Sequence, residues 1–133
     1  MKDKKRTITD ILSDYQTLPE YLDRELVDVN QVSLFGDYPL HVAAVRGSVE
    51  DIKILVDHGA NINAKGEYDY TALHHAAEQG HADAVKALME KGADPNLTDV
   101  NGCTPLEIAL LLDKNDQTGE YKKIIEELKR QQT

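Results

Sequence analysis

The sequence predicts an all-α fold, in which short helix-turn-helix units stack into a solenoid and short turn or hairpin loops connect them. First, a segment that begins at Pro39 recurs at Ala72, an offset of 33 residues with no gap. Second, each copy carries an Ala-Ala pair and two glycines at matching positions, with apolar residues at helical spacing between the glycines. Third, the 133 residues include only six Tyr, one Phe and no Trp, so the core must come from small aliphatic side chains, which suit closely packed helices.

The two copies are PLHVAAVRGSVEDIKILVDHGANIN and ALHHAAEQGHADAVKALMEKGADPN, and they match position by position. His41 aligns with His74, and a further step of 33 reaches TPLEIA, which begins at Thr104. A step backwards from Asn63 reaches Asn30. The pattern resembles the ankyrin repeat family, whose period is 33 and whose signature is T-P-L-H-x-A. The resemblance is close over residues 30–97, partial over 98–133 and weak before 30.

Each unit is expected to contain two helices. The first helix holds the alanine pair, and Gly47 or Gly80 ends it because glycine adopts the left-handed conformation without steric cost. The second helix ends at Gly59 or Gly92. Its apolar residues follow i, i+3, i+4 spacing and are Ile52, Leu55 and Val56 in one unit and Val85, Leu88 and Met89 in the next.

A single domain over residues 1–133 follows, because one unit cannot bury its apolar face alone and stacking buries a continuous core. We expect an N-terminal cap (1–30), repeat 1 (31–63), repeat 2 (64–96), and a divergent repeat 3 with the C-terminal cap (97–133). The cap should contain a helix near residues 8–15 and a second short helix from Pro19 to Leu26. About seven residues are inserted near 113–119, and a closing helix over 121–132 directs Ile124, Ile125 and Leu128 inward.

The charge balance narrows the range of partners. Fifteen basic residues against 24 acidic ones give a net charge of −9, which repels phosphate backbones and anionic lipid. Nucleic acid and membrane surfaces are therefore not expected as partners, and a basic protein is favoured. The single cysteine excludes an internal disulfide framework. No signal peptide and no apolar run of about 20 residues is present, so a cytoplasmic protein is expected.

Three histidines, His74, His75 and His81, lie within TALHHAAEQGH and raise the possibility of a metal site. Adjacent residues on a helix point about 100° apart, so His74 and His75 should not converge on one ion. The resemblance gives a structural role instead: at the TPLH position, His41 and His74 should form a hydrogen bond that ties the turn to the first helix. We therefore expect no metal and no cofactor.

No constellation in the sequence supports catalysis. Cys103 has no histidine at the matched position of its unit, where Glu107 stands, and the serines lack a nucleophile-elbow context. The chain is predicted not to be an enzyme. The alternative, a cryptic enzyme using histidines and carboxylates, would require His74 and His81 to be exposed together in one pocket.

The resemblance also implies a concave binding face, formed by the turn tips and the exposed side of each first helix. Carried over position by position, the partner-binding residues are Leu34, Phe35, Asp37, Arg46, Glu67, Tyr68, Tyr70, Glu78, Gln79, Asn101, Leu111 and Leu112, with Val45, Val100 and Cys103 at equivalent positions. Aromatic residues in an acidic rim are typical interface anchors. The alternative is that these rings pack against neighbouring turns. At one tip, Asp69 occupies a position where the family usually has glycine, so a positive φ is expected there.

The predicted function is a non-catalytic protein–protein interaction module. Its acidity favours a stoichiometric inhibitor, such as an immunity protein or antitoxin that covers a basic toxin. A general scaffold or adaptor is the alternative. The chain should be a monomer, or a weak homodimer through exposed Phe35, Leu111 or Leu112.

Overall fold

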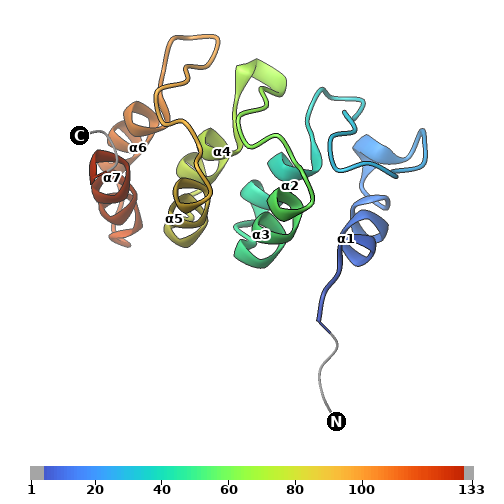
Figure 1. The fold of residues 1–133 in the computed structure, drawn as a ribbon. Helices are drawn as coiled ribbons and strands as arrows, with labels where there is room; N and C mark the ends of the chain where they lie inside the picture. The colour runs from blue at the N-terminus through green and yellow to red at the C-terminus, as the bar shows by residue number, and fades with distance from the viewer. Residues whose placement is uncertain (1–4, 131–133) are drawn as a thin grey trace.

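The computed structural model describes residues 5–130, and over this range the chain is helical with no strand (Figure 1). The sequence prediction of an all-α solenoid is confirmed. Two short 3-10 turns, labelled η, accompany the α-helices. The elements are α1 (Ile8–Tyr15), η1 (Pro19–Tyr21), α2 (Pro39–Arg46), α3 (Val49–Asp57), η2 (Glu67–Asp69), α4 (Ala72–Glu78), α5 (Ala82–Glu90), α6 (Pro105–Asp113) and α7 (Glu120–Arg130).

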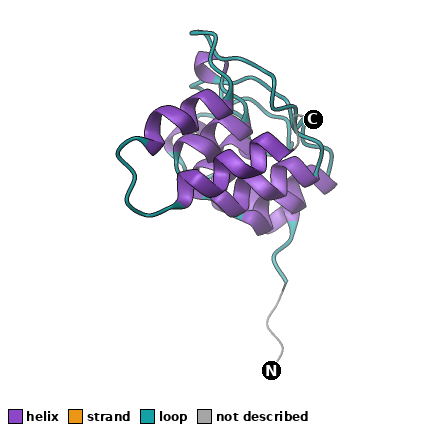
Figure 2. Cartoon of the chain, turned by 90° about the vertical axis from the view of Figure 1, so that its left-hand side faces the viewer, coloured by secondary structure: helices purple, strands orange, loops and turns teal. Residues whose placement is uncertain are grey.

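The helices form two layers. The first layer holds the first helix of each unit, and α2, α4 and α6 contact one another in order. The second layer holds the second helices, and α3, α5 and α7 contact one another in the same order. The turns that precede α2, α4 and α6 project to one side of the stack, at the top of Figure 1. Figure 2, seen from the α6/α7 end, shows these loops gathered beyond the helices. Three consecutive turn tips are therefore neighbours on one edge.

The period of 33 is visible in the hydrogen bonds as well as in the sequence. One backbone bond closes each turn at equivalent positions: Ser33 N–H to Asp37 O, Gly66 N–H to Tyr70 O, and Asp99 N–H to Cys103 O, at 2.7, 2.8 and 2.9 Å. Between units, the Asn30 side chain accepts from the Asn61 N–H at 2.8 Å, and Asn63 accepts from the Asp94 N–H at 2.9 Å. The repeated sequence positions thus build the same joints in successive units.

The boundaries of the first helices have local causes. Thr71 caps α4: its hydroxyl accepts from the His74 N–H, while the Thr71 N–H donates to the His74 ring, which satisfies two otherwise free donors. Thr104 and Glu107 form the same reciprocal pair at α6. Glu107 therefore replaces the family histidine without loss of the cap. Gly47 and Gly80 end α2 and α4 with φ of 69° and 76°, as predicted.

The core consists of small aliphatic residues, as the composition predicted. Ala43, Ala44, Ala76 and Ala77 on α2 and α4 are fully buried, and their small side chains allow the neighbouring helices to pack closely. The second helices supply the larger side chains: Ile52, Leu55, Val85, Leu88, Ile124 and Leu128 are fully buried. Ile125, also predicted to face inward, is partly buried against this core.

An ion-pair network fastens α1 to the first repeat. Asp51 on α3 is almost fully buried and accepts from the Tyr15 hydroxyl and from the Arg6 Nε, both at 2.7 Å. Arg6 also contacts Asp14 at 2.8 Å. The hydrogen bond to Asp51 raises the pKa of Arg6 above its ordinary value, although burial acts in the opposite direction. The cap is thus attached by buried polar bonds as well as by apolar packing.

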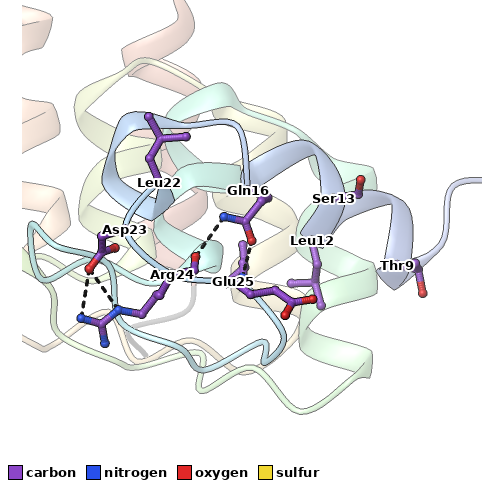
Figure 3. Close-up of a pocket in the computed structure, with 9 residues that line it drawn as sticks. Thr9, Leu12, Ser13, Gln16, Leu22, Asp23, Arg24 and Glu25 are labelled. Carbon is purple, nitrogen blue, oxygen red and sulfur yellow. Dashed lines mark hydrogen bonds and ion pairs between the residues drawn. The ribbon is translucent and has the colours of Figure 1, made fainter.

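The predicted second cap helix from Pro19 to Leu26 is wrong. Only η1, over Pro19–Tyr21, is helical. The Gln16 side chain explains the difference, because its amide donates to the carbonyls of Tyr21 and Arg24 and its oxygen accepts from the Leu26 N–H. These backbone groups would be used within a helix, and Gln16 satisfies them in a loop (Figure 3).

The C-terminal part contains the expected first helix of the third unit, an inserted loop and a closing helix. α6 ends at Asp113, and the insertion forms a loop from 114 to 119 before α7. The Asp116 carboxylate organises this loop by accepting from Thr118 and Gly119. The expected closing helix reaches Arg130, and its predicted last two positions, 131 and 132, lie outside the described residues, as do residues 1–4 of the cap.

Candidate binding face at the turn tips

A hollow of about 340 Å³ opens on the edge where the turn tips lie. Its lining comes from three consecutive turns and from α4. We call it the acidic hollow, because four of its nine residues are carboxylates and none is Lys or Arg. The lining residues are Asp37, Glu67, Tyr68, Tyr70, His75, Glu78, Asp99, Val100 and Asn101.

Each carboxylate of the acidic hollow keeps at least one oxygen without a hydrogen bond from residues 5–130. Asp37 uses Oδ1 to accept from the Glu67 N–H at 3.0 Å. Glu78 uses Oε2 to accept from the Tyr70 hydroxyl at 2.7 Å, and Asp99 uses Oδ1 to accept from two backbone N–H groups of its own turn. Neither oxygen of Glu67 accepts a hydrogen bond from the described part of the chain. The hollow therefore presents a set of unused acceptors with negative charge.

Two tyrosines from one turn, Tyr68 and Tyr70, line the acidic hollow beside the carboxylates. Tyr70 is partly buried and stacks on the His74 ring with centroids 5.1 Å apart, while burial, followed by the bond to Glu78, raises its pKa. The hydroxyl therefore stays neutral and donates to Glu78. Tyr68 is 67% exposed, so most of this residue is open to solvent at the rim of the hollow.

The turn that carries these tyrosines is strained. Asp69 has φ of 60°, which confirms the sequence prediction, and Tyr68 has φ of 59°, which the sequence analysis missed. A left-handed conformation costs a residue other than glycine roughly 1–2 kcal/mol. Such strain persists only where the surroundings impose it, and it is most frequent at functional sites. The turn thus holds an exposed tyrosine in a position better suited to glycine.

His75 on α4 is the one histidine that lines the hollow. Its Nε2 is buried and has no hydrogen-bond partner in the described part of the chain. Burial, followed by repulsion from His41, lowers the pKa of His75 to about 4. The ring is therefore neutral near pH 7 and adds no positive charge to the four carboxylates.

The other histidines have structural roles. The His41 ring accepts from the Tyr38 N–H at 2.9 Å and its Nε2 bonds to the Ala64 carbonyl at 3.0 Å, while His74 contacts Thr71 and the Cys103 carbonyl. The predicted bond between turn and first helix is confirmed, and each ring also reaches the next turn. Burial lowers the pKa of both rings.

His81 is likewise used within the stack. It bonds to the Val45 carbonyl at 2.9 Å, away from the acidic hollow. His74 and His81 thus do not converge in a pocket, which was the condition for a catalytic role. No group of three or more His, Cys, Asp or Glu within residues 5–130 is arranged to hold a metal ion. At Cys103, burial and then Asp99 raise the pKa of the thiol, which disfavours the nucleophilic thiolate.

Of the twelve residues predicted to bind a partner, the structure brings six together in the acidic hollow: Asp37, Glu67, Tyr68, Tyr70, Glu78 and Asn101. Phe35 and Leu34 are exposed on the first turn tip, outside the hollow, and Phe35 is 56% accessible. Gln79 is exposed at the end of α4, and Leu111 and Leu112 are exposed at the end of α6.

Arg46 lies beside a second, smaller hollow of about 220 Å³ that shares Asp37 and His75 with the acidic hollow. Its guanidinium pairs with Asp14 at 3.1 Å and lies 4.9 Å from the Tyr15 ring centre. This contact links α2 to the N-terminal cap.

A larger hollow, of about 570 Å³, lies at the N-terminal end of the stack (Figure 3). α1 and the loop that follows η1 line it. Three of its residues are charged, Asp23, Arg24 and Glu25, and Asp23 pairs with Arg24 at 3.1 Å. It contains none of the predicted partner-binding residues.

The sequence analysis missed His75 and Asp99 as members of the site. The period aligns Asp99 with Gly66 and Ser33, which identifies it as a turn residue but not as a member of the site. The sequence analysis treats His75 only as a candidate metal ligand. It aligns with Val42, which lines the smaller hollow, but the sequence alone does not show that either position faces a hollow.

The architecture defines a helical-repeat protein whose turns project along one edge. The family model for ankyrin repeats (three copies) matches residues 11–99, which is more than half of the chain. The protein therefore belongs to the ankyrin-repeat family, whose members serve as protein–protein interaction modules and are generally non-catalytic. In the described residues, the structure contains no helix long and apolar enough to cross a membrane.

Proposed function

We propose that this ankyrin-repeat protein binds a basic partner protein through its turn-tip face and acts by covering the partner, as a stoichiometric inhibitor of the immunity type. The observation that carries the proposal is the acidic hollow, with four carboxylates and two tyrosines beside the exposed Phe35. Tyrosine and phenylalanine are frequent interface anchors, and complementary charge accelerates association. The net charge of −9 supports the same choice of partner.

The proposal is tested by using the tagged protein as bait in a lysate of its source organism, followed by reconstitution with the purified partner. The variant Phe35→Ala/Tyr68→Gly removes both exposed rings of the face, and glycine accepts the positive φ at position 68. A matched control, Leu22→Ala/Val27→Ala, removes two equally exposed apolar side chains from the N-terminal cap. We expect a 1:1 complex that the first variant weakens by at least roughly ten-fold and the control leaves intact.

The salt dependence of the affinity and the stoichiometry of the complex distinguish the proposed inhibitor from the alternative, a general scaffold. Exposed charges are screened over about 8–10 Å at physiological salt, so the affinity should fall as salt rises. An affinity that is independent of salt would contradict the proposal that the partner is basic and is bound through complementary charge. Several weakly bound partners, none in a stable 1:1 complex, would favour a general scaffold, and a partner retained by the Phe35→Ala/Tyr68→Gly variant would place the binding site elsewhere.

A further inference from the structure

We propose that α6 is a self-association surface, on which the α6 helix of a second copy of this chain packs in antiparallel orientation. The sequence of α6, PLEIALLLD, is apolar on nearly every side, and a helix of this kind is normally buried. Only Pro105 and Ala109 of its nine residues are fully buried, whereas α4 buries five of its seven. Much of α6 is therefore left uncovered by residues 5–130. The inference does not depend on the proposed function.

The repeat identifies the uncovered face as the one that would meet a further unit. Leu110 aligns with Ala77, which is fully buried, yet Leu110 is 43% exposed because no described unit follows α6. Glu107 aligns with His74, whose ring bonds to the Cys103 carbonyl of the next turn at 2.9 Å. The face of α6 that carries Glu107 and Leu110 thus continues the surface by which each first helix packs on the next.

The other outer helices of the stack present polar side chains to solvent, as terminal repeats must for solubility. The exposed residues of α1 are Thr9 and Ser13, and those of α7 are all charged. By contrast, α6 exposes Leu110, Leu111 and Leu112. A cluster of exposed leucines on one helix is typical of an interaction surface.

Two charged residues flank the leucines on the same stripe of α6. Glu107, Leu110, Leu111 and Lys114 follow i, i+3, i+4, i+7 spacing, which places them on one side of a helix. Lys114, the C-cap residue, keeps right-handed helical dihedral angles, so it continues this stripe. Lys114 is exposed and forms no ion pair within residues 5–130, and Oε2 of Glu107 accepts no hydrogen bond there. Both charges are available to another molecule.

The order of these residues makes the stripe self-complementary. If two α6 helices lie antiparallel, with a two-fold axis between Leu110 and Leu111, the leucines meet at the centre. Each Glu107 then lies opposite the Lys114 of the other copy, and symmetry forms this pair twice. A parallel arrangement would instead place like charges together. A closed dimer requires a patch that complements itself, so the stripe fits a second copy of this chain.

The contact is small, which limits its affinity. α6 has nine residues and is about 13.5 Å long at 1.5 Å per residue. Interfaces that bury less than about 1,200 Å² in total belong to weak and transient complexes. The net charge of −9 on each copy also opposes association. We therefore expect a reversible dimer with a dissociation constant in the upper micromolar range, and a monomer at the low micromolar concentrations of optical unfolding experiments.

Sedimentation equilibrium of the full chain, from low micromolar to millimolar concentration at physiological salt, measures this monomer–dimer equilibrium. Leu111→Glu places a charge at the centre of the contact and should weaken dimerisation by at least roughly ten-fold. The matched control is Leu22→Glu, the same change at a leucine of the N-terminal cap. Leu22 is 66% exposed and Leu111 is 64% exposed, so the control should leave the dissociation constant unchanged.

A charge exchange tests the antiparallel arrangement. Lys114→Glu should weaken the dimer roughly three- to ten-fold, because two like-charged pairs replace two attractive ones. Lys86→Glu makes the same change in net charge at an exposed position on α5 and should have little effect. Adding Glu107→Lys to Lys114→Glu restores both pairs and should return the dissociation constant to within about three-fold of the original. Because Glu107 also caps α6, circular dichroism checks that this double variant is folded.

The outcomes decide between a second copy and other occupants. A chain that stays monomeric up to millimolar concentration would overturn the inference, as would a dimer that Leu111→Glu leaves intact or that Leu22→Glu weakens equally. No recovery in a folded double variant would overturn the antiparallel arrangement. If the chain stayed monomeric while Leu111→Glu abolished binding of the partner protein, that partner would be the occupant of α6. A dimer with the expected variant effects supports the inference whether or not the turn-tip face binds a basic partner.

Discussion

Leu88→Ala is the substitution that most directly tests the stacked core. Leu88 lies on α5, is fully buried and belongs to the continuous core, with 0% of its surface exposed. Truncation removes the apolar contacts and leaves a cavity that the neighbouring helices fill only in part. Comparable Leu→Ala substitutions cost about 2–5 kcal/mol, and we expect the free energy of unfolding to fall by that amount.

The corresponding change in melting temperature follows from the size of the chain. Unfolding entropy near 60 °C is about 2.1 cal/mol/K per residue, so 133 residues give roughly 0.28 kcal/mol/K. A loss of 2–5 kcal/mol therefore lowers Tm by roughly 7–18 °C. Thermal and urea unfolding followed by circular dichroism at 222 nm measure both quantities.

The matched control is Leu111→Ala, the same chemical change at a side chain that is 64% exposed on α6. Its cost should stay within about 0.5 kcal/mol. If Leu88→Ala changed stability by no more than this control, the burial of α5 against its neighbours, and with it the stacking of the two central units, would be refuted.

Three further predictions concern the cap, the buried histidines and the strained turn. Asp51→Ala should destabilise by roughly 1.5–3 kcal/mol, because Tyr15 and Arg6 lose a charged partner. Stability should decrease as pH falls from about 6.5 toward 4: burial lowers the folded-state pKa of His75 to about 4, so the unfolded chain binds more protons in that window. Tyr68→Gly should leave stability unchanged or raise it by up to about 1 kcal/mol, because relief of the strain outweighs the added freedom of glycine.

A control variant or a contradicting measurement tests each of these three predictions. The Asp51→Ala and Tyr15→Phe changes should be non-additive in a double-mutant cycle, and strict additivity would show that their bond contributes nothing. His75→Gln should reduce the pH slope without abolishing it, since burial also lowers the pKa of His41 and His74; an unchanged slope would contradict the assignment. A clear loss of stability in Tyr68→Gly, measured by urea unfolding, would mean that the ring packs in the structure.

Local patterns in the sequence were sufficient for most of the fold. The glycine at position 80 predicted the end of α4, because a left-handed residue is favourable there only for glycine. The cap loop after η1 was not predictable in this way, since Pro19 to Leu26 has helix-compatible residues. Its conformation depends on Gln16, a side chain outside the segment that takes over the backbone bonds.

The candidate site likewise combines residues that the sequence places together with residues that only the packing of units brings together. Placing Glu67, Tyr68 and Tyr70 together required only the period, because they share one turn. Asp99 and His75 join them through the distances between successive units, which the packing of α2, α4 and α6 sets. No pattern within one unit contains that information.

The sequence by itself determined the repeat, the positions of the helices within the repeats, the core of small aliphatic residues and the acidity of the chain. These properties depend on contacts between residues near in sequence, or on composition. Only the tertiary structure decided that four carboxylates from three turns and one helix surround a single hollow, that Arg46 turns to Asp14 and the cap, and that Tyr68 is held in a left-handed conformation. The physical reason is that each depends on the spacing and rotation between units, and these follow from how buried side chains fit together across the stack.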